Sequence, residues 1–372
     1  MATPLMADPD GIDVTGLSHL VDPNWEDQTD RRCIAAALVE VVYQRQRNDK
    51  RVDQWSALLP FKVKEEIIIK DEQGKSILIG VIFEWVGRSK LASGCAGKPP
   101  SEVVAFRGTV WKSEIRLGDF SENVNVALAR MDSLSRVGMA LKYLQRSIQR
   151  HGPDNIWIVG HSLGASIALA AVRKLSREER EKLEAHLFNP PFISPRLPEL
   201  KFFEMVGRLL SKIRNGSPSL PFPQLEGIYK GIQGACDVVA LRMGLQDDNR
   251  LLELYGEFIG VGNWIPNLYV NKKDLVCCTY ISYLETWKGI YTHKSHLVHE
   301  TMKHLFCFEV ANKRTPWHMV PSAKLFVAVT NNNYHSLCQW WLKDLQIQSI
   351  HDYVPPKEII QWNANTIETN LP

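Results

Sequence analysis

Short apolar runs alternate along this chain with segments whose apolar residues have helical spacing. The clearest example surrounds residue 162. Residues 155–159, Asn-Ile-Trp-Ile-Val, form a short β-rich run that predicts a buried strand. Residues 165–175 are small and apolar with basic residues near their end, which predicts a helix packed on a sheet. The order at this point is therefore strand, tight turn, helix.

The same pattern predicts further elements before and after this unit. Strands are expected at 64–70, 76–85, 102–107, 186–189, 267–270 and 323–330, and helices at 30–46, 126–150 and 337–345. Asp30 stands where it could cap the first helix. Strands that alternate with helices predict an α/β fold with a mostly parallel central sheet and helices on both faces.

The 372 residues fit one enlarged α/β domain with an insertion. We expect a flexible N-terminal tail over 1–25, the domain over 26–350 and a C-terminal tail over 351–372. Within the domain, about 198–262 contains helical patches without a clear strand and is interpreted as a cap-like insertion.

Composition narrows the functional classes. The hydrophobic fraction of 45% and charged fraction of 23% are ordinary for a globular protein. A net charge of +3 without a dense Lys/Arg run argues against nucleic-acid binding. The N-terminus is polar and acidic, unlike a secretory signal, and no apolar run reaches the roughly 18 residues of a membrane span. We therefore expect an intracellular protein. The cytoplasm is the preferred location, and an organelle is the alternative.

Seven cysteines form no framework spacing, which favours reduced thiols. The adjacent Cys277 and Cys278 are interpreted as buried packing rather than redox chemistry.

Ser162 is the candidate nucleophile. Gly160-His161-Ser162-Leu163-Gly164 fits the G-x-S-x-G pattern, which places a nucleophilic serine on a strained turn between a strand and a helix. The alternative is an ordinary glycine-flanked loop. An active serine needs a base, a carboxylate that orients the base, and donors for the oxyanion.

Asp274 is the candidate carboxylate. It follows the expected strand 267–270 in a polar turn, after the serine in chain order. A turn aspartate that caps its own backbone is the alternative interpretation. Asp237 is the second candidate, but it falls inside the proposed insertion, and Asp247 and Asp248 lie in a charged run.

His335 is the candidate base, because it follows the strand at 323–330 after a polar loop. His161 has the wrong place in the turn for this role. A second group comprises His293, His296, His299 and His304. Its order H-x-x-H-E differs from the zinc motif H-E-x-x-H, so a solvated helix face is the preferred interpretation and no metal or organic cofactor is expected.

Two backbone N–H groups are candidate oxyanion donors. Leu163 follows the nucleophile directly, and Thr109 follows the strand in "VVAFRGT", where Gly108 permits close approach. Each donor of this kind is worth roughly 3 kcal/mol of barrier.

The motifs "VVAFRGT", "IVGHSLGA", "FNPP" and "YVNKKDLVC", with "DRRCIAAALVEVVYQRQR" and "HSLCQWW", together resemble the class 3 lipases. Over about 30–345 the chain resembles the plant branch labelled GDSL esterase/lipase-like, although its nucleophile motif is GHSLG. The resemblance implies an α/β-hydrolase fold. It also implies a triad of Ser162, Asp274 and His335, oxyanion donors at Thr109 and Leu163, and a lid region at 111–125.

Two segments depart from the typical class 3 pattern. "FNPPFISP" replaces a glycine-rich "FGxPRVGN"-like segment, and the lid region is polar. The first departure leaves the acyl-pocket wall and the substrate open, and the polar lid region favours a soluble acyl or aromatic ester over bulk triacylglycerol. The expected partner is thus a small-molecule or lipid ester, with peripheral membrane contact left open. The alternatives are an acyltransferase with the same triad and a lipase-like scaffold or ligand receptor without chemistry.

Overall fold

The computed structural model describes residues 20–50, 52–70, 73–87, 98–108, 135–192, 249–291, 318–330, 333–357 and 360. Several predicted features lie outside the described residues: Thr109, the lid region 111–125, most of the insertion with Asp237, Asp247 and Asp248, and the group of four histidines at 293–304.

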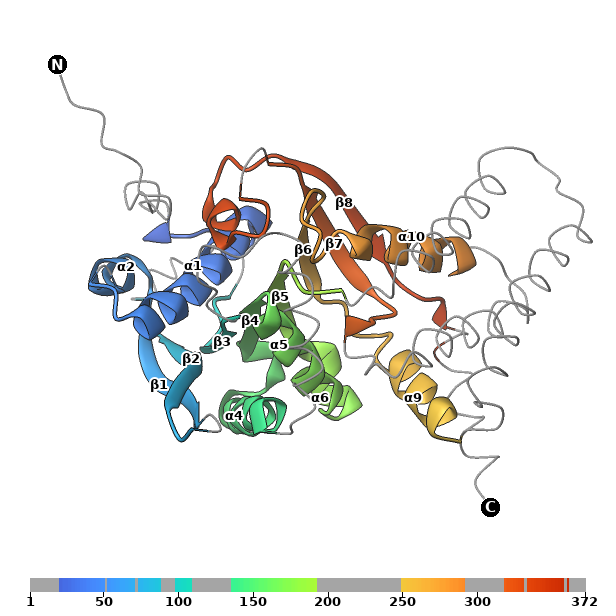
Figure 1. The fold of residues 1–372 in the computed structure, drawn as a ribbon, viewed down its shortest axis with the longest axis horizontal. Helices are drawn as coiled ribbons and strands as arrows, with labels where there is room; N and C mark the ends of the chain where they lie inside the picture. Colours follow the sequence, from blue (N-terminus) through green and yellow to red (C-terminus); the bar gives the residue numbers. More distant parts are fainter. Residues whose placement is uncertain are drawn as a thin grey trace, which may run out of the picture.

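The described residues are built around one central β-sheet (Figure 1). In the described ranges its eight strands lie side by side in chain order: β1 Phe61–Lys70, β2 Ser76–Trp85, β3 Glu102–Phe106, β4 Ile156–His161, β5 Glu184–Phe188, β6 Asn267–Asn271, β7 Ala323–Ala328 and β8 Ile347–Tyr353. Neighbours from β3 to β7 are parallel, whereas β1, β2 and β8 join antiparallel. The predicted α/β fold with a mostly parallel sheet is confirmed.

Helices cover both faces of this sheet (Figure 1). The described helices are α1 Gln28–Arg47, α2 Val52–Leu58, α4 Ser135–His151, α5 Leu163–Arg173, α6 Arg177–Lys182, α9 Asn249–Gly260 and α10 Thr279–Tyr291, with 3-10 turns η3 Pro153–Asn155 and η5 Leu337–Trp341. Side chains of β4 alternate between the faces: Ile156 and Ile158 join the core under α4 and α5, whereas Trp157 and Val159 join the core under α1 and η5. Parallel strands buried on both faces read as continuous apolar runs, which is why the sequence revealed them.

The inner ends of both predicted tails belong to the packed fold. Within 1–25, Leu20 is fully buried, and Trp25 packs against the rings of Phe61 and Trp85. At the other end, β8 continues to Tyr353, into the segment assigned to the C-terminal tail. The side chains of β8 alternate between half-buried and exposed, so this edge strand lacks the apolar run by which the inner strands were recognised.

Two predicted helix ends were also wrong. The first helix starts at Gln28, where Asp27 and not Asp30 is the N-cap and accepts from the Thr29 N–H at 2.7 Å. Asp30 instead accepts from the Asn24 N–H and pairs with Lys343. The helix expected over 337–345 is only the 3-10 turn η5, after which the chain extends into β8.

Candidate active site

Ser162 lies on a strained turn between β4 and α5. Its φ of 53° and ψ of −131° place a non-glycine residue in a sparsely populated region. The flanking glycines permit the turn: a Cβ on Gly160 would lie 2.7 Å from the Gly164 carbonyl oxygen, and one on Gly164 would collide with the Phe106 carbonyl of β3. This is the geometry expected of a nucleophile turn rather than of an ordinary loop.

The structure brings the three candidate side chains of the triad together. Ser162 Oγ lies 2.9 Å from His335 Nε2, and His335 Nδ1 lies 2.7 Å from Asp274 Oδ2. The serine follows β4, the aspartate follows β6 and the histidine follows β7, so all three lie at the carboxyl end of parallel strands. Because a carboxylate only accepts, Nδ1 carries the imidazole proton and the Nε2 lone pair faces the serine hydroxyl.

The carboxylate of Asp274 is buried and surrounded by donors. The Val276 N–H donates to Oδ1 at 3.0 Å, and the Cys277 thiol donates to Oδ2 at 3.1 Å. Burial alone would raise the pKa of Asp274, but the charge and hydrogen bond of His335, with the bonds from Cys277 and Asn189, hold this pKa below its usual value. An ionised carboxylate is the form that orients an imidazole and stabilises its cation.

Sequence reasoning missed two contacts of this site. Asn189, known from the sequence only as part of "FNPP", donates to Asp274 Oδ2 at 2.6 Å. The hydroxyl of Tyr43 on α1 contacts His161 and Gly108, which lie next to Ser162 in sequence and in space, respectively. These contacts join residues at least 65 positions apart, so no local pattern points to them. An asparagine directly after a buried strand is the signal that the sequence does carry.

His161 is not the base and instead connects two loops of the site. Its Nε2 lies 2.9 Å from the His335 carbonyl oxygen, and its Nδ1 lies 2.9 Å from the Tyr43 hydroxyl. Because a carbonyl only accepts, Nε2 carries the proton and Nδ1 accepts from Tyr43. The Tyr43 oxygen in turn accepts from the Gly108 N–H at 2.7 Å. The loop after β3 and the loop that carries His335 are thus joined through the Tyr43 hydroxyl and the neutral imidazole of His161.

Acid is expected to destabilise the fold through His161. Burial, with repulsion from His335, lowers the pKa of His161 from its ordinary 6.5 to about 3. Between these values the unfolded chain binds more protons at this residue, so the free energy of unfolding falls as the pH falls, by up to about 1.4 kcal/mol per pH unit. Urea unfolding of His161→Gln between about pH 6 and 4 should show a shallower pH dependence than the wild type. Equal slopes would contradict a buried neutral His161.

The surroundings of Ser162 suit an oxyanion. Leu163 is the first residue of α5, so its N–H has no acceptor within the helix. The loop after β3 runs beside the nucleophile, because a Cβ on Gly108 would lie 2.9 Å from Ser162 Cβ. Thr109, the other predicted donor, follows this glycine directly and lies outside the described residues.

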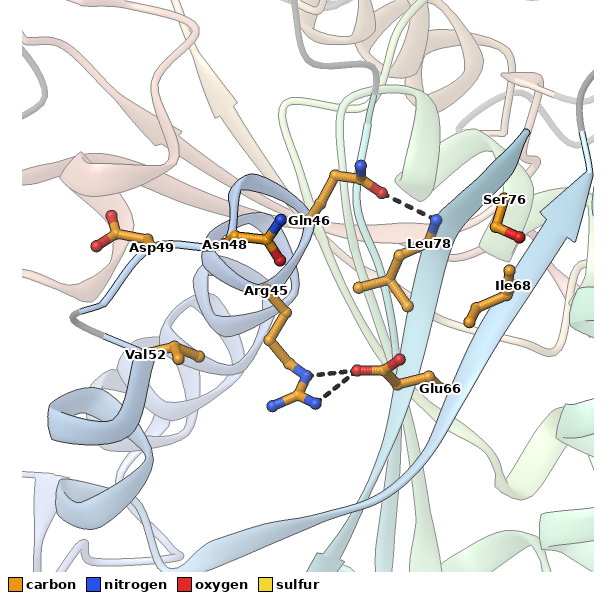
Figure 2. A pocket seen from close by; sticks show the side chains of 9 residues that line it. All are labelled: Arg45, Gln46, Asn48, Asp49, Val52, Glu66, Ile68, Ser76 and Leu78. Atoms are coloured by element: carbon orange, nitrogen blue, oxygen red, sulfur yellow. Dashed lines mark hydrogen bonds and ion pairs between the residues drawn. The ribbon is translucent and has the colours of Figure 1, made fainter.

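A separate pocket lies between the end of α1 and the β1–β2 hairpin (Figure 2). Arg45 pairs across it with Glu66 at 2.5 Å, and Gln46 accepts from the Leu78 N–H at 2.9 Å. None of the three triad candidates lines this pocket. It is therefore not part of the candidate active site.

The described residues contain no group of three or more His, Cys, Asp or Glu side chains arranged to hold a metal ion. Their four cysteines, Cys33, Cys277, Cys278 and Cys338, are free thiols. In the same ranges, no helix combines the length and apolar character that a membrane-crossing span requires.

A strained serine turn at the carboxyl edge of a mostly parallel sheet, with a histidine and an aspartate in hydrogen-bonded sequence, is the arrangement of the α/β-hydrolase fold. Residues 103–215 match the family model described as Lipase (class 3). The chain is also 24% identical over 371 residues to a GDSL esterase/lipase of Arabidopsis thaliana, with 93% of this chain and 98% of the relative covered. No solved structure matches. The chain is thus similar to class 3 lipases and to a plant esterase/lipase, and these likenesses support a hydrolase of the lipase or esterase kind.

Proposed function

We propose that this chain is a serine carboxylester hydrolase in which Ser162 is the nucleophile, His335 the base and Asp274 the orienting acid. The observation that carries the proposal is the continuous hydrogen-bonded series from Ser162 Oγ through His335 to Asp274 Oδ2, with contacts of 2.9 and 2.7 Å. Such a series is what nucleophilic catalysis by serine requires.

In the first half of the reaction, Ser162 Oγ attacks the ester carbonyl carbon while His335 Nε2 takes the hydroxyl proton. The negative charge on the carbonyl oxygen is stabilised by the N–H groups of Leu163 and Thr109. The tetrahedral intermediate then breaks its bond to the alcohol oxygen. His335 returns its proton to this oxygen, so the alcohol leaves neutral and the acyl group stays on Ser162.

In the second half, water attacks the acyl carbon as His335 Nε2 accepts one of its protons. The same two N–H groups hold the second oxyanion. The bond to Ser162 Oγ breaks, His335 returns the proton to the serine and the carboxylic acid leaves. Throughout, Asp274 stays ionised and compensates the positive charge that His335 carries during each transfer.

The substrate is proposed to be a soluble ester, either a simple acyl ester or an ester of an aromatic alcohol, rather than bulk triacylglycerol. The polar sequence of 111–125, which differs from the typical class 3 pattern, supports this choice. A panel of p-nitrophenyl esters from acetyl to long acyl, with esters of aromatic alcohols, tests it. We expect saturable hydrolysis of soluble members and no burst of activity on emulsified triacylglycerol. Turnover confined to emulsified triacylglycerol would contradict the substrate class.

The same panel distinguishes the two rival functions. An added alcohol acceptor that diverts the acyl group from acid to a new ester would indicate an acyltransferase. A purified, folded chain that hydrolyses no member would favour the scaffold or receptor function. The complete serine, histidine and aspartate geometry supports hydrolysis over a scaffold.

A further inference from the structure

Asn189 directly follows β5 and has an unusual backbone conformation. It is fully buried, and its φ is 44°, in the left-handed region that few residues other than glycine adopt. Its N–H donates to the Tyr269 carbonyl oxygen at 2.8 Å, which continues the pairing of β5 with β6. Asparagine tolerates this region better than most residues, but still less well than glycine. This less favourable backbone conformation points to a role for the side chain.

The side-chain amide of Asn189 has one orientation that satisfies all its partners. Its Nδ2 lies 2.6 Å from Asp274 Oδ2 and 3.1 Å from the Tyr334 carbonyl oxygen, and both of these atoms are acceptors. Its Oδ1 accepts from the Trp340 indole N–H, which can only donate. Reversing the amide would bring donors against donors and acceptors against acceptors. Every hydrogen-bonding group of the amide is thus used.

These bonds connect the two segments that must meet for catalysis. Asp274 belongs to the loop after β6, and Tyr334 immediately precedes His335 in the loop after β7. Trp340 belongs to η5, which closes the same loop, and it is fully buried. A single amide therefore holds the carboxylate and the backbone next to the imidazole in one frame.

We propose that Asn189 is a positioning residue that sets the distance and angle between Asp274 and His335. It would touch no reacting atom and would act through the acid and the backbone of the base, so this inference rests on the proposed function. The backbone supports a dedicated role, because Asn189 carries a side chain at a positive φ that glycine would adopt without strain. In this chain an amide is present at the cost of a less favourable backbone conformation.

Two substitutions separate the amide from the backbone conformation. Asn189→Ala removes the amide and also disfavours the positive φ, whereas Asn189→Gly removes the amide and relieves the backbone. Asn267→Ala is the matched control, since Asn267 Nδ2 donates to the Ala185 carbonyl at 3.0 Å at the opposite end of β6. This control removes an amide-to-carbonyl bond of the same kind away from the triad.

The expected result is that Asn189→Ala and Asn189→Gly both lower kcat for a p-nitrophenyl ester about 100-fold with KM unchanged, because the acid and base lose their alignment. The low-field proton resonance of the His335–Asp274 hydrogen bond, recorded by NMR on the resting protein, should be lost or shifted in both. Asn267→Ala should retain both readouts. Asn189→Gly with wild-type kcat and an unchanged low-field resonance would overturn the proposal.

The NMR readout keeps the two proposals distinguishable. A wild-type protein that shows the low-field resonance but hydrolyses no ester contradicts the proposed function. The positioning role is then decided by the resonance alone: its loss in Asn189→Gly and retention in Asn267→Ala supports the role, and its retention in Asn189→Gly overturns it. Because glycine accepts the positive φ, this variant provides a folded protein even where alanine does not.

Discussion

Replacing Ser162 with alanine is expected to lower kcat for a p-nitrophenyl ester by about a million-fold while the protein stays folded. Without Oγ no acyl-enzyme forms, and His335 has no hydroxyl from which to take a proton. Losses of this order follow removal of a serine nucleophile, since the remaining groups act only as a unit. Steady-state kinetics give the change, and thermal unfolding reports whether the fold is intact.

Ser166→Ala is the matched control for this substitution. Ser166 lies one helical turn further along α5 and is equally buried, and its hydroxyl has no hydrogen-bond partner among the described residues. Removal of this hydroxyl should leave kcat within a factor of about two, because it breaks no hydrogen bond and leaves no buried partner unsatisfied. Turnover that survives in Ser162→Ala would contradict the assignment of the nucleophile.

Replacing Asp274 with alanine is expected to lower kcat about ten-thousand-fold, the scale seen when the acid of a serine triad is removed. The imidazole of His335 would lose the acceptor that fixes its tautomer and the charge that stabilises its cation. Asp274→Asn separates these two effects. Its amide oxygen should take the Oδ2 place, because His335, Asn189 and Cys277 all donate there. The NH2 group of the asparagine would then face the Val276 N–H, so the variant loses the charge and this one hydrogen bond. It keeps an acceptor for His335 and should retain more activity than alanine.

Asp237→Ala tests the alternative acid suggested by the sequence. We expect its kcat to equal that of the wild type, because Asp274 already has the position and the hydrogen bond that the role requires. A larger loss from Asp237→Ala than from Asp274→Ala would move the acid into the insertion and would contradict the proposed triad.

The sequence predicted the triad candidates because their positions follow from local patterns. Ser162 lies between two glycines, Gly160 and Gly164, at which a larger residue would collide with neighbouring backbone. Asp274 and His335 each follow an apolar strand. In a parallel sheet such strand ends meet at one edge, so chain order was enough to nominate them. The inner strands were predictable for the same reason, since burial on both faces leaves continuous apolar runs.

The contacts that support the triad could not be predicted in this way. Asn189 reaches Asp274 across 85 positions, and Tyr43 reaches His161 across 118. Such pairs depend on the register of β5 against β6 and on how α1 packs across the sheet, which no short window of sequence contains. The exposed edge strand β8 was missed for a different reason, because half-buried strands carry a weaker periodic signal.

Reaction of the folded wild-type protein with a fluorophosphonate, followed by intact mass and peptide mapping, tests most directly whether Ser162 is an activated nucleophile. The reagent forms a stable bond with a serine only when a neighbouring base activates it. The geometry around Ser162 predicts one adduct per chain, located on Ser162, and none on Ser162→Ala. Absence of an adduct on the wild type, or an adduct on another residue, would contradict the assignment of Ser162 as the activated nucleophile.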